Sequence, residues 1–329
     1  MKTVSTSHSR GRGCLVWLGR MAVFVGGLVL LGAIYESKAE ASDARVYPPP
    51  GKLVDVGGYR LHINCTGTGG PTVVIDAGLG DWSTMWAWVQ PEVAKTTQVC
   101  TYDRAGNGWS DAGPLPRTAV QYAKELHTLL HEANIPGPYV LVGHSLGGLT
   151  VRVFTDMYPS EVAGVVLIDS MSPRQFKQSS VDAAPQINSQ SRPFTIFSAL
   201  GRIGLVRLLV RPLGLVPNLP PELDKAYVSR MVRPANLQAY LGDESQGMPE
   251  SGRQAEAVKT FGDIPLIVLT ARQNPITGWQ EWQTELLQLS SNSQQLFAES
   301  GHGIEIEQPE AAVAAIVKMV ELVRQTMHQ

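Results

Sequence analysis

Short apolar runs alternate along the chain with longer stretches that are apolar on one side only. The short runs are rich in β-branched residues and predict strands, several of them buried on both faces of a sheet. The clearest strands are expected at 72–77, 97–102, 139–142, 164–169 and 264–270, with shorter ones at 52–57, 59–65 and 295–298.

Helical periodicity follows most of these strands. Residues 118–134 place Val120, Ala123, Leu126 and Leu130 on one face, which is typical of an amphipathic helix. Further helices are expected at 82–94, directly after the 139–142 strand, and at 309–325. Strands that alternate with helices predict an α/β fold with a mostly parallel sheet.

The alternation stops between residues 173 and 261, where prolines separate three short helical patterns, one of them at 197–209. We interpret this segment as an inserted helical cap. The α/β core is then built from residues 51–172 and 262–329.

The first forty residues have a different pattern. Lys2, Arg10, Arg12 and Arg20 precede an uncharged apolar run at 21–35, and no acidic residue occurs before Glu36. A positive flank and an apolar segment predict a membrane anchor at 1–41, followed by a linker at 42–50. The alternative is a cleaved export signal, with Ala39-Glu40-Ala41 as the cleavage site. Both interpretations place the domain outside the cytoplasm.

Composition narrows the classes of function. The chain has 329 residues, is 43% hydrophobic and carries a formal net charge of −2, so nothing favours nucleic-acid binding. Three cysteines, at 14, 65 and 100, are too scattered for a zinc site. The glycine loop at 103–110 lacks the Lys-Ser/Thr ending of a phosphate loop, and we expect it to support neighbouring loops. No metal or cofactor is predicted.

The stretch Tyr139–Thr150 combines a strand, a sharp turn and the start of a helix, with Ser145 on the turn. A serine hydroxyl becomes nucleophilic when a base takes its proton and backbone N–H groups stabilise the resulting oxyanion. Gly143 and Gly147 suit this strained turn, because glycine tolerates unusual dihedrals and close packing. Ser145 is therefore the predicted nucleophile.

The predicted base is His302. It lies between Gly301 and Gly303, directly after the last strand, where the backbone leaves the ring free to aim. The other histidines lie in the terminal segments, an early strand, the surface of a helix or the turn itself.

The acidic partner of the base is less clearly marked. Asn274 occupies the loop after 264–270, where an aspartate is expected, and asparagine carries no charge. We therefore predict Asp169, which ends the strand after the serine helix, because catalytic groups gather at the carboxyl ends of parallel strands. Glu281 and Glu285 are the alternatives.

The oxyanion is expected to bind the backbone N–H groups of Leu146 and Leu79. Gly78, Gly80 and His144 are the predicted substrate-binding residues, although the His144 side chain is expected to point away from Ser145. Gly78 and Gly80 flank Leu79 and let a substrate approach the backbone.

These motifs together resemble the α/β-hydrolase fold superfamily with an inserted cap. Gly78-Leu79-Gly80, the 103–110 loop, Gly143–Gly148 and Ser300-Gly301-His302 carry the resemblance, which extends from about Lys52 to Met327. It implies an eight-stranded sheet of order 1-2-4-3-5-6-7-8. That order makes the second and fourth strands neighbours, so the resemblance also implies a disulfide between Cys65 and Cys100 in an oxidising compartment.

A serine at 145 disfavours the epoxide hydrolase and haloalkane branches of this family, which use an aspartate there. We expect a carboxylesterase-like or lipase-like hydrolase acting on an ester with an apolar acyl group, anchored to a membrane with its domain outside the cytoplasm. An amidase or thioesterase with the same triad is one alternative. A ligand-binding protein that has lost catalysis, as Asn274 suggests, is the other. The oligomeric state is not predicted.

Overall fold

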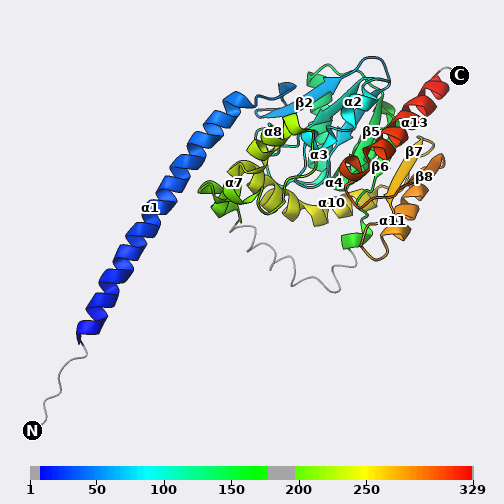
Figure 1. Ribbon diagram of the computed structural model, residues 1–329. Helices are drawn as coiled ribbons and strands as arrows, with labels where there is room; N and C mark the ends of the chain where they lie inside the picture. Colours follow the sequence, from blue (N-terminus) through cyan, green and yellow to red (C-terminus); the bar gives the residue numbers. More distant parts are fainter. Residues whose placement is uncertain (1–7, 177–196, 328–329) are drawn as a thin grey trace, which may run out of the picture.

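The computed structural model describes residues 8–176 and 197–327, which form an α/β domain and one long N-terminal helix (Figure 1). Eight strands make a single sheet of order β1-β2-β4-β3-β5-β6-β7-β8, which confirms the predicted fold class. The pairs β1·β2 and β2·β4 are antiparallel and the others parallel. The strands are β1 Lys52–Asp55, β2 Arg60–Thr66, β3 Thr72–Asp76, β4 Val99–Tyr102, β5 Tyr139–His144, β6 Val162–Ile168, β7 Leu266–Ala271 and β8 Ser293–Ala298.

Helices cover both faces of the sheet. Alternate residues of β5 point to opposite sides, so that Leu141 joins one core cluster while Val140 and Val142 join the other. The first cluster lies under α3 (Ala119–Glu132) and α4 (Leu146–Met157), and the second under α13 (Pro309–Met327). Two-sided burial explains why the central strands read as continuous apolar runs.

The helix predicted at 82–94 is wrong as a continuous element. The segment forms a short 3-10 turn, η1 (Ser83–Trp86), and one helical turn, α2 (Gln90–Val93). The tight turn sends the side chains of Trp82 and Trp86 into the core, where each is 1% exposed. Burial of these indoles outweighs the weaker helical preference of the backbone.

Most of the predicted cap lies between β6 and β7 as a set of short helices. Residues 177–196 of it lie outside the described residues. The helix predicted at 197–209 is interrupted at Gly204, whose φ of 73° is left-handed. The described cap helices are α7 Leu205–Leu209, α8 Pro221–Met231, α9 Pro234–Gln238, the π-helical turn η3 Ala239–Glu244, and α10 Ser245–Ala257. After β7, three short helices precede α13: α11 Trp279–Leu286, η4 Leu287–Leu289 and α12 Ile304–Glu307. One further short turn, η2 Pro159–Glu161, lies before β6.

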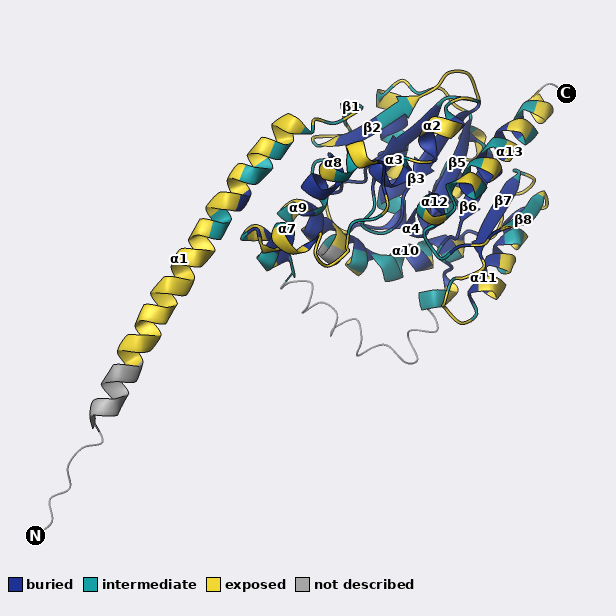
Figure 2. Cartoon of the chain, in the orientation of Figure 1, coloured by how far each residue is buried: buried dark blue, intermediate teal, exposed yellow. Residues whose placement is uncertain are grey.

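The N-terminal helix α1 (His8–Val46) is one unbroken element of 39 residues, about 58 Å long at 1.5 Å per residue. It therefore continues through the first half of the predicted linker. Its segment Leu15–Val46 is long and apolar enough to cross a membrane. Figure 2 shows exposed residues along most of the described part of α1, with buried and intermediate residues toward its C-terminal end.

Ion pairs join α1 to the cap, beside the close packing of Gly32 and Tyr35 against the segment before α7. Arg207 binds both carboxylate oxygens of Glu36, at 2.7 and 2.9 Å, and Asp43 at 2.6 Å. Arg233 binds Glu40 at 3.0 Å. The three acids recur at intervals of four and three residues, which places them on one face of the helix. Glu36 is only 2% exposed, and this bidentate geometry is the strong form of an ion pair.

The disulfide between Cys65 and Cys100 is present, which confirms the pairing implied by the family strand order. The two residues are directly opposite in the β2·β4 ladder, at a sequence separation of 35. The bond joins the N-terminal hairpin covalently to the strands of the core.

We expect replacement of both cysteines by serine to lower the free energy of unfolding by about 2–4 kcal/mol, because the cross-link restricts the unfolded chain. Denaturant unfolding of oxidised protein measures this difference, with Cys14→Ser as the matched control. Equal midpoints for the double variant and the control would contradict the stabilising role.

Candidate active site

Ser145 lies between the last residue of β5 and the first residue of α4, with a φ of 50° that side chains rarely adopt. Close packing around the turn requires glycine at two positions. A Cβ atom on Gly147 would lie 2.3 Å from the carbonyl oxygen of Asp76, and one on Gly143 would lie 2.7 Å from Gly147. The turn thus holds the Ser145 side chain at the carboxyl end of the sheet, as the motif predicts.

His302 lies in the loop after β8 and reaches Ser145 across the sheet end. Its Nε2 is 2.9 Å from Ser145 Oγ, and its Nδ1 is 2.7 Å from Asp169 Oδ2. The carboxylate therefore fixes Nδ1 as the protonated nitrogen and leaves Nε2 to accept the serine proton. The structure brings the three predicted catalytic residues together in the order that a serine triad requires.

Asp169 is fully buried and follows β6 directly. Its Oδ1 accepts hydrogen bonds from Ala271 N at 2.9 Å and from the Trp279 indole at 2.7 Å, and its Oδ2 accepts one from Asn274 Nδ2 at 2.8 Å. These donors compensate the cost of burying a charge. They also aim the remaining lone pair at His302.

Asn274 therefore has a place in the site that the sequence did not reveal. It lies beside the acid as a donor to Asp169, and its Nδ2 is 3.4 Å from His302 Nδ1. Glu281 is exposed on α11, and Glu285 forms an ion pair with Arg174 instead. Among the described residues, it is Asp169, and neither of these glutamates, that hydrogen bonds to His302.

The electrostatic environment of His302 suits a general base. Burial alone lowers the pKa of an imidazole, but the hydrogen bond and negative charge of Asp169 outweigh it and raise the pKa of His302 above its ordinary value. The imidazolium formed during a reaction is thereby stabilised.

The predicted oxyanion donors lie at two backbone positions near Ser145. Leu146 is the first residue of α4, so its N–H has no partner within the helix. Leu79 lies between Gly78, whose carbonyl accepts from Arg104, and Gly80, whose N–H donates to Glu244 at 2.8 Å. The N–H of Gly80 is thus used to hold the cap rather than a substrate.

Arg104, from the glycine loop 103–110, fixes the segment that carries Leu79. The guanidinium is buried and binds Asp76 at 2.6 Å, the Ala77 carbonyl at 2.7 Å and Glu244 of the cap at 2.7 Å. Burial lowers the pKa of Arg104, yet Glu244 and Asp76 outweigh this and hold its pKa above the ordinary value. This contact agrees with the supporting role predicted for the loop.

His144 is 3% exposed and lies behind His302, as the predicted orientation of its side chain requires. Its Nε2 donates to the His302 carbonyl at 2.9 Å, so a neutral His144 presents a lone pair at Nδ1. This position suits support of the loop that carries His302. Gly78 likewise faces His144 and Asp81, which would lie within 3.0 Å of a Cβ there.

Asp81, His144 and Glu305 form a buried cluster whose metal-ligating atoms all lie within 4.8 Å of one another. Glu305 Oε1 is 3.4 Å from His144 Nδ1. Burial raises the pKa of Glu305 to about 7 and that of Asp81 to about 6, while burial and the neighbouring His302 lower the pKa of His144 to about 4. His144 Nδ1 has no hydrogen-bond partner among the described residues, and a proton on Glu305 Oε1, 3.4 Å away, is placed to face its lone pair.

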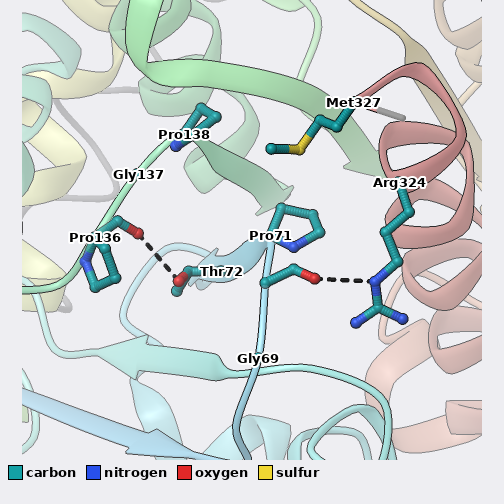
Figure 3. A pocket seen from close by; sticks show the side chains of 9 residues that line it. Gly69, Pro71, Thr72, Pro136, Gly137, Pro138, Arg324 and Met327 are labelled. Atoms are coloured by element: carbon teal, nitrogen blue, oxygen red, sulfur yellow. Dashed lines mark hydrogen bonds between the residues drawn. The ribbon is translucent and has the colours of Figure 1, made fainter. Parts of the chain in front are cut away.

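A surface cavity of 370 Å³ lies elsewhere, at the amino ends of β3 and β5 (Figure 3). It is lined by glycine and proline loops, and Arg324 closes one side by donating to the Gly70 carbonyl at 2.9 Å. Neither Ser145 nor His302 borders it.

Comparisons with known proteins agree with this architecture. The chain is 27% identical over 273 residues to the uncharacterized protein YqjL of Bacillus subtilis, covering 80% of this chain and 90% of YqjL. A probable transporter, efuK of Hormonema carpetanum, is 35% identical over 126 residues, which span 36% of this chain and only 18% of the relative.

Among solved structures, a thermophilic esterase from Thermogutta terrifontis superimposes with a TM-score of 0.63 at 22% identity, covering 82% of this chain and 97% of the esterase. At this identity the likeness shows the fold alone. The family profile described as "alpha/beta hydrolase fold" matches residues 71–309. With the sheet order and the turn around Ser145, this match establishes that the chain belongs to the α/β-hydrolase fold family.

Proposed function

We propose that the protein is a serine hydrolase that cleaves carboxylic esters through an acyl-enzyme. The observation that carries this proposal is the continuous chain of contacts from Ser145 through His302 to Asp169, at 2.9 and 2.7 Å. Ser145 Oγ attacks the ester carbonyl while His302 Nε2 takes its proton. The same nitrogen then gives this proton to the departing alcohol.

The N–H groups of Leu79 and Leu146 receive the negative charge on the carbonyl oxygen during this step. In the second half of the reaction, His302 takes a proton from the water that attacks the acyl group, and it returns this proton to Ser145 Oγ as the acid leaves. No cofactor is required, and the partner is a small-molecule ester. An aspartate nucleophile, which epoxide hydrolysis would need, is replaced here by Ser145.

The alternatives use the same residues. An amidase or thioesterase needs an identical triad, so the leaving group decides between them and an esterase. A non-catalytic binding protein was suggested by Asn274. The carboxylate of Asp169 in contact with His302 supports catalysis instead, because it supplies the charge that Asn274 lacks.

We further propose that α1 is retained as a membrane anchor, with the hydrolase domain outside the cytoplasm. The alternative cleavage site, Ala39-Glu40-Ala41, lies in the part of α1 that is paired with the cap. Cleavage there would remove Glu36 and leave Arg207 with Asp43 alone. An ester with an apolar acyl group is the substrate that such an anchored enzyme would meet in a membrane.

Fluorophosphonate labelling with peptide mapping tests the triad. We expect labelling at Ser145 that is lost in Ser145→Ala and falls by about 10⁴ in rate in Asp169→Asn. Asn274→Ala removes one of several donors to Asp169 and should cost about tenfold or less. A collapse in Asn274→Ala with Asp169→Asn unaffected would show that Asp169 is not the acid, and unlabelled folded wild type would favour a binding protein.

The pH dependence of kcat/KM for an activated ester tests the base. Only neutral His302 accepts a proton, so activity falls as the pH falls through its raised pKa. In Asp169→Asn, the residual activity should begin to fall only at a lower pH, because the charge that raises the pKa of His302 is gone. Glu281→Gln is the control with an unchanged limb, and equal limbs in all three proteins would contradict this assignment.

We expect the buried cluster of Asp81, His144 and Glu305 to position the loop that carries His302. Glu305→Gln keeps an N–H donor facing His144 Nδ1 and should retain kcat/KM. Glu305→Leu leaves that lone pair unsatisfied in the interior and should lower kcat/KM about tenfold. Thermal unfolding of both variants separates loss of activity from loss of fold. Equal damage by the two substitutions would contradict the proton-donor role.

A further inference from the structure

The cap carries an apolar surface on its α7 segment that packing against the described residues does not cover. Inward-facing Val206 and Val210 are buried against the small cap cluster with Val228 and Val232. The opposite side should be polar in a helix that faces water. It is instead a leucine patch, formed by Leu205, Leu208, Leu209, Leu213 and Leu215, all of them exposed.

The extent of exposure is large for this residue type. Leu208 is 60% exposed and Leu213 is 58% exposed. Burying a leucine side chain is worth about 1.5–3 kcal/mol, so five exposed leucines in eleven consecutive residues are a substantial cost in water. Contiguous apolar surface of this kind marks a site of contact with another apolar phase.

The place where the patch lies beside α1 indicates that this apolar phase is the membrane. A Cβ atom on Gly32 would lie 2.5 Å from the Ile203 carbonyl oxygen, and one on Gly204 would lie 2.8 Å from the Tyr35 ring. Gly32 and Tyr35 belong to the last turn of the apolar run, just before Glu36. The segment that leads into α7 thus packs at the end of the proposed span (Figure 1).

The ion pairs of Arg207 fix the position of α7 along α1. Arg207 lies within α7, and its bonds to Glu36 and Asp43 join the patch to the first charged turns of α1. Because α1 is one continuous helix, the depth of its apolar run in a bilayer determines the depth of the leucine patch. Amphipathic segments at an interface insert about 5–10 Å into the boundary between headgroups and acyl chains.

We propose that the leucine patch is a second membrane contact, inserted into the headgroup–acyl boundary beside the anchor. This inference rests on the proposed anchoring by α1 and adds a surface that the anchor alone does not require. Exposed Arg202 precedes the patch, and exposed Arg211, which pairs with Asp224 at 2.5 Å, lies within it, so both would lie near lipid phosphates. The patch would hold the cap against the layer in which an apolar ester dissolves.

Depth-dependent quenching of the full-length protein in nanodiscs of phosphatidylcholine and phosphatidylglycerol tests this contact. In a Cys14→Ser background, single cysteines are placed by Leu208→Cys, Leu213→Cys, Phe24→Cys and Met327→Cys, and labelled with an environment-sensitive fluorophore. Phe24 reports the anchor. Met327 is 61% exposed at the end of α13, across the domain from α1, and is the matched control.

We expect nitroxide lipids labelled near the headgroup to quench positions 208 and 213 and leave position 327 bright, while deep nitroxides quench position 24. Quenching at 24, with 208 and 213 as bright as 327, would overturn the leucine patch and keep the anchor. A bright position 24 would overturn the anchoring itself. Leu208→Asp/Leu213→Asp should lose quenching at a third label site, Leu205→Cys, without loss of turnover of a soluble short-chain ester.

Discussion

The buried guanidinium of Arg104 is the contact on which the catalytic end of the sheet depends. It joins three parts of the fold that are far apart in sequence: the end of β3 at Asp76, the loop that carries Leu79, and the cap at Glu244. A planar group with several donors can satisfy all three at once. Without it, the buried carboxylates of Asp76 and Glu244 would lose their ion pair, and a buried charge without a counter-charge costs more than the pair contributes to stability.

The register of β5 against β6 determines where Ser145 and Asp169 lie. His144 on β5 is opposite Ile168 on β6, so the next residues, Ser145 and Asp169, leave the sheet side by side. Both adopt positive φ, 50° and 39°, which turns each chain sharply away from its strand. Such strain persists only where the surroundings over-determine it. Here hydrogen bonds from Ala271, Trp279 and Asn274 hold the second of these residues.

Ser145 and His302 could be predicted as nucleophile and base because each has a local signal, whereas the sheet order followed from the family resemblance. Ser145 is marked by its strand, glycines and helix, and His302 by its flanking glycines. Asp169 was accessible through topology, since it ends a neighbouring strand. The Cys65–Cys100 pair followed from the strand order in the same way.

Other features depend on distant contacts that no local pattern carries. The indole of Trp279 and the amide of Asn274 converge on Asp169 only after β6 and β7 pair. The 82–94 segment was predicted as a helix because its propensity is helical, but the core required two buried indoles. The docking of α1 depends on three acids that pair with arginines 164 to 193 residues away in sequence.

The Cys65–Cys100 bond has a mechanical consequence. Force applied along α1 enters the domain partly through the β1–β2 hairpin, whose outer strand pairs with β2 alone. Hydrogen bonds in such a ladder can break one after another from the end of the strand. The bond fastens the end of β2 to β4, next to the parallel core. A pull on the tether can therefore peel the hairpin only as far as Cys65, and beyond that point the load is carried by covalent bonds.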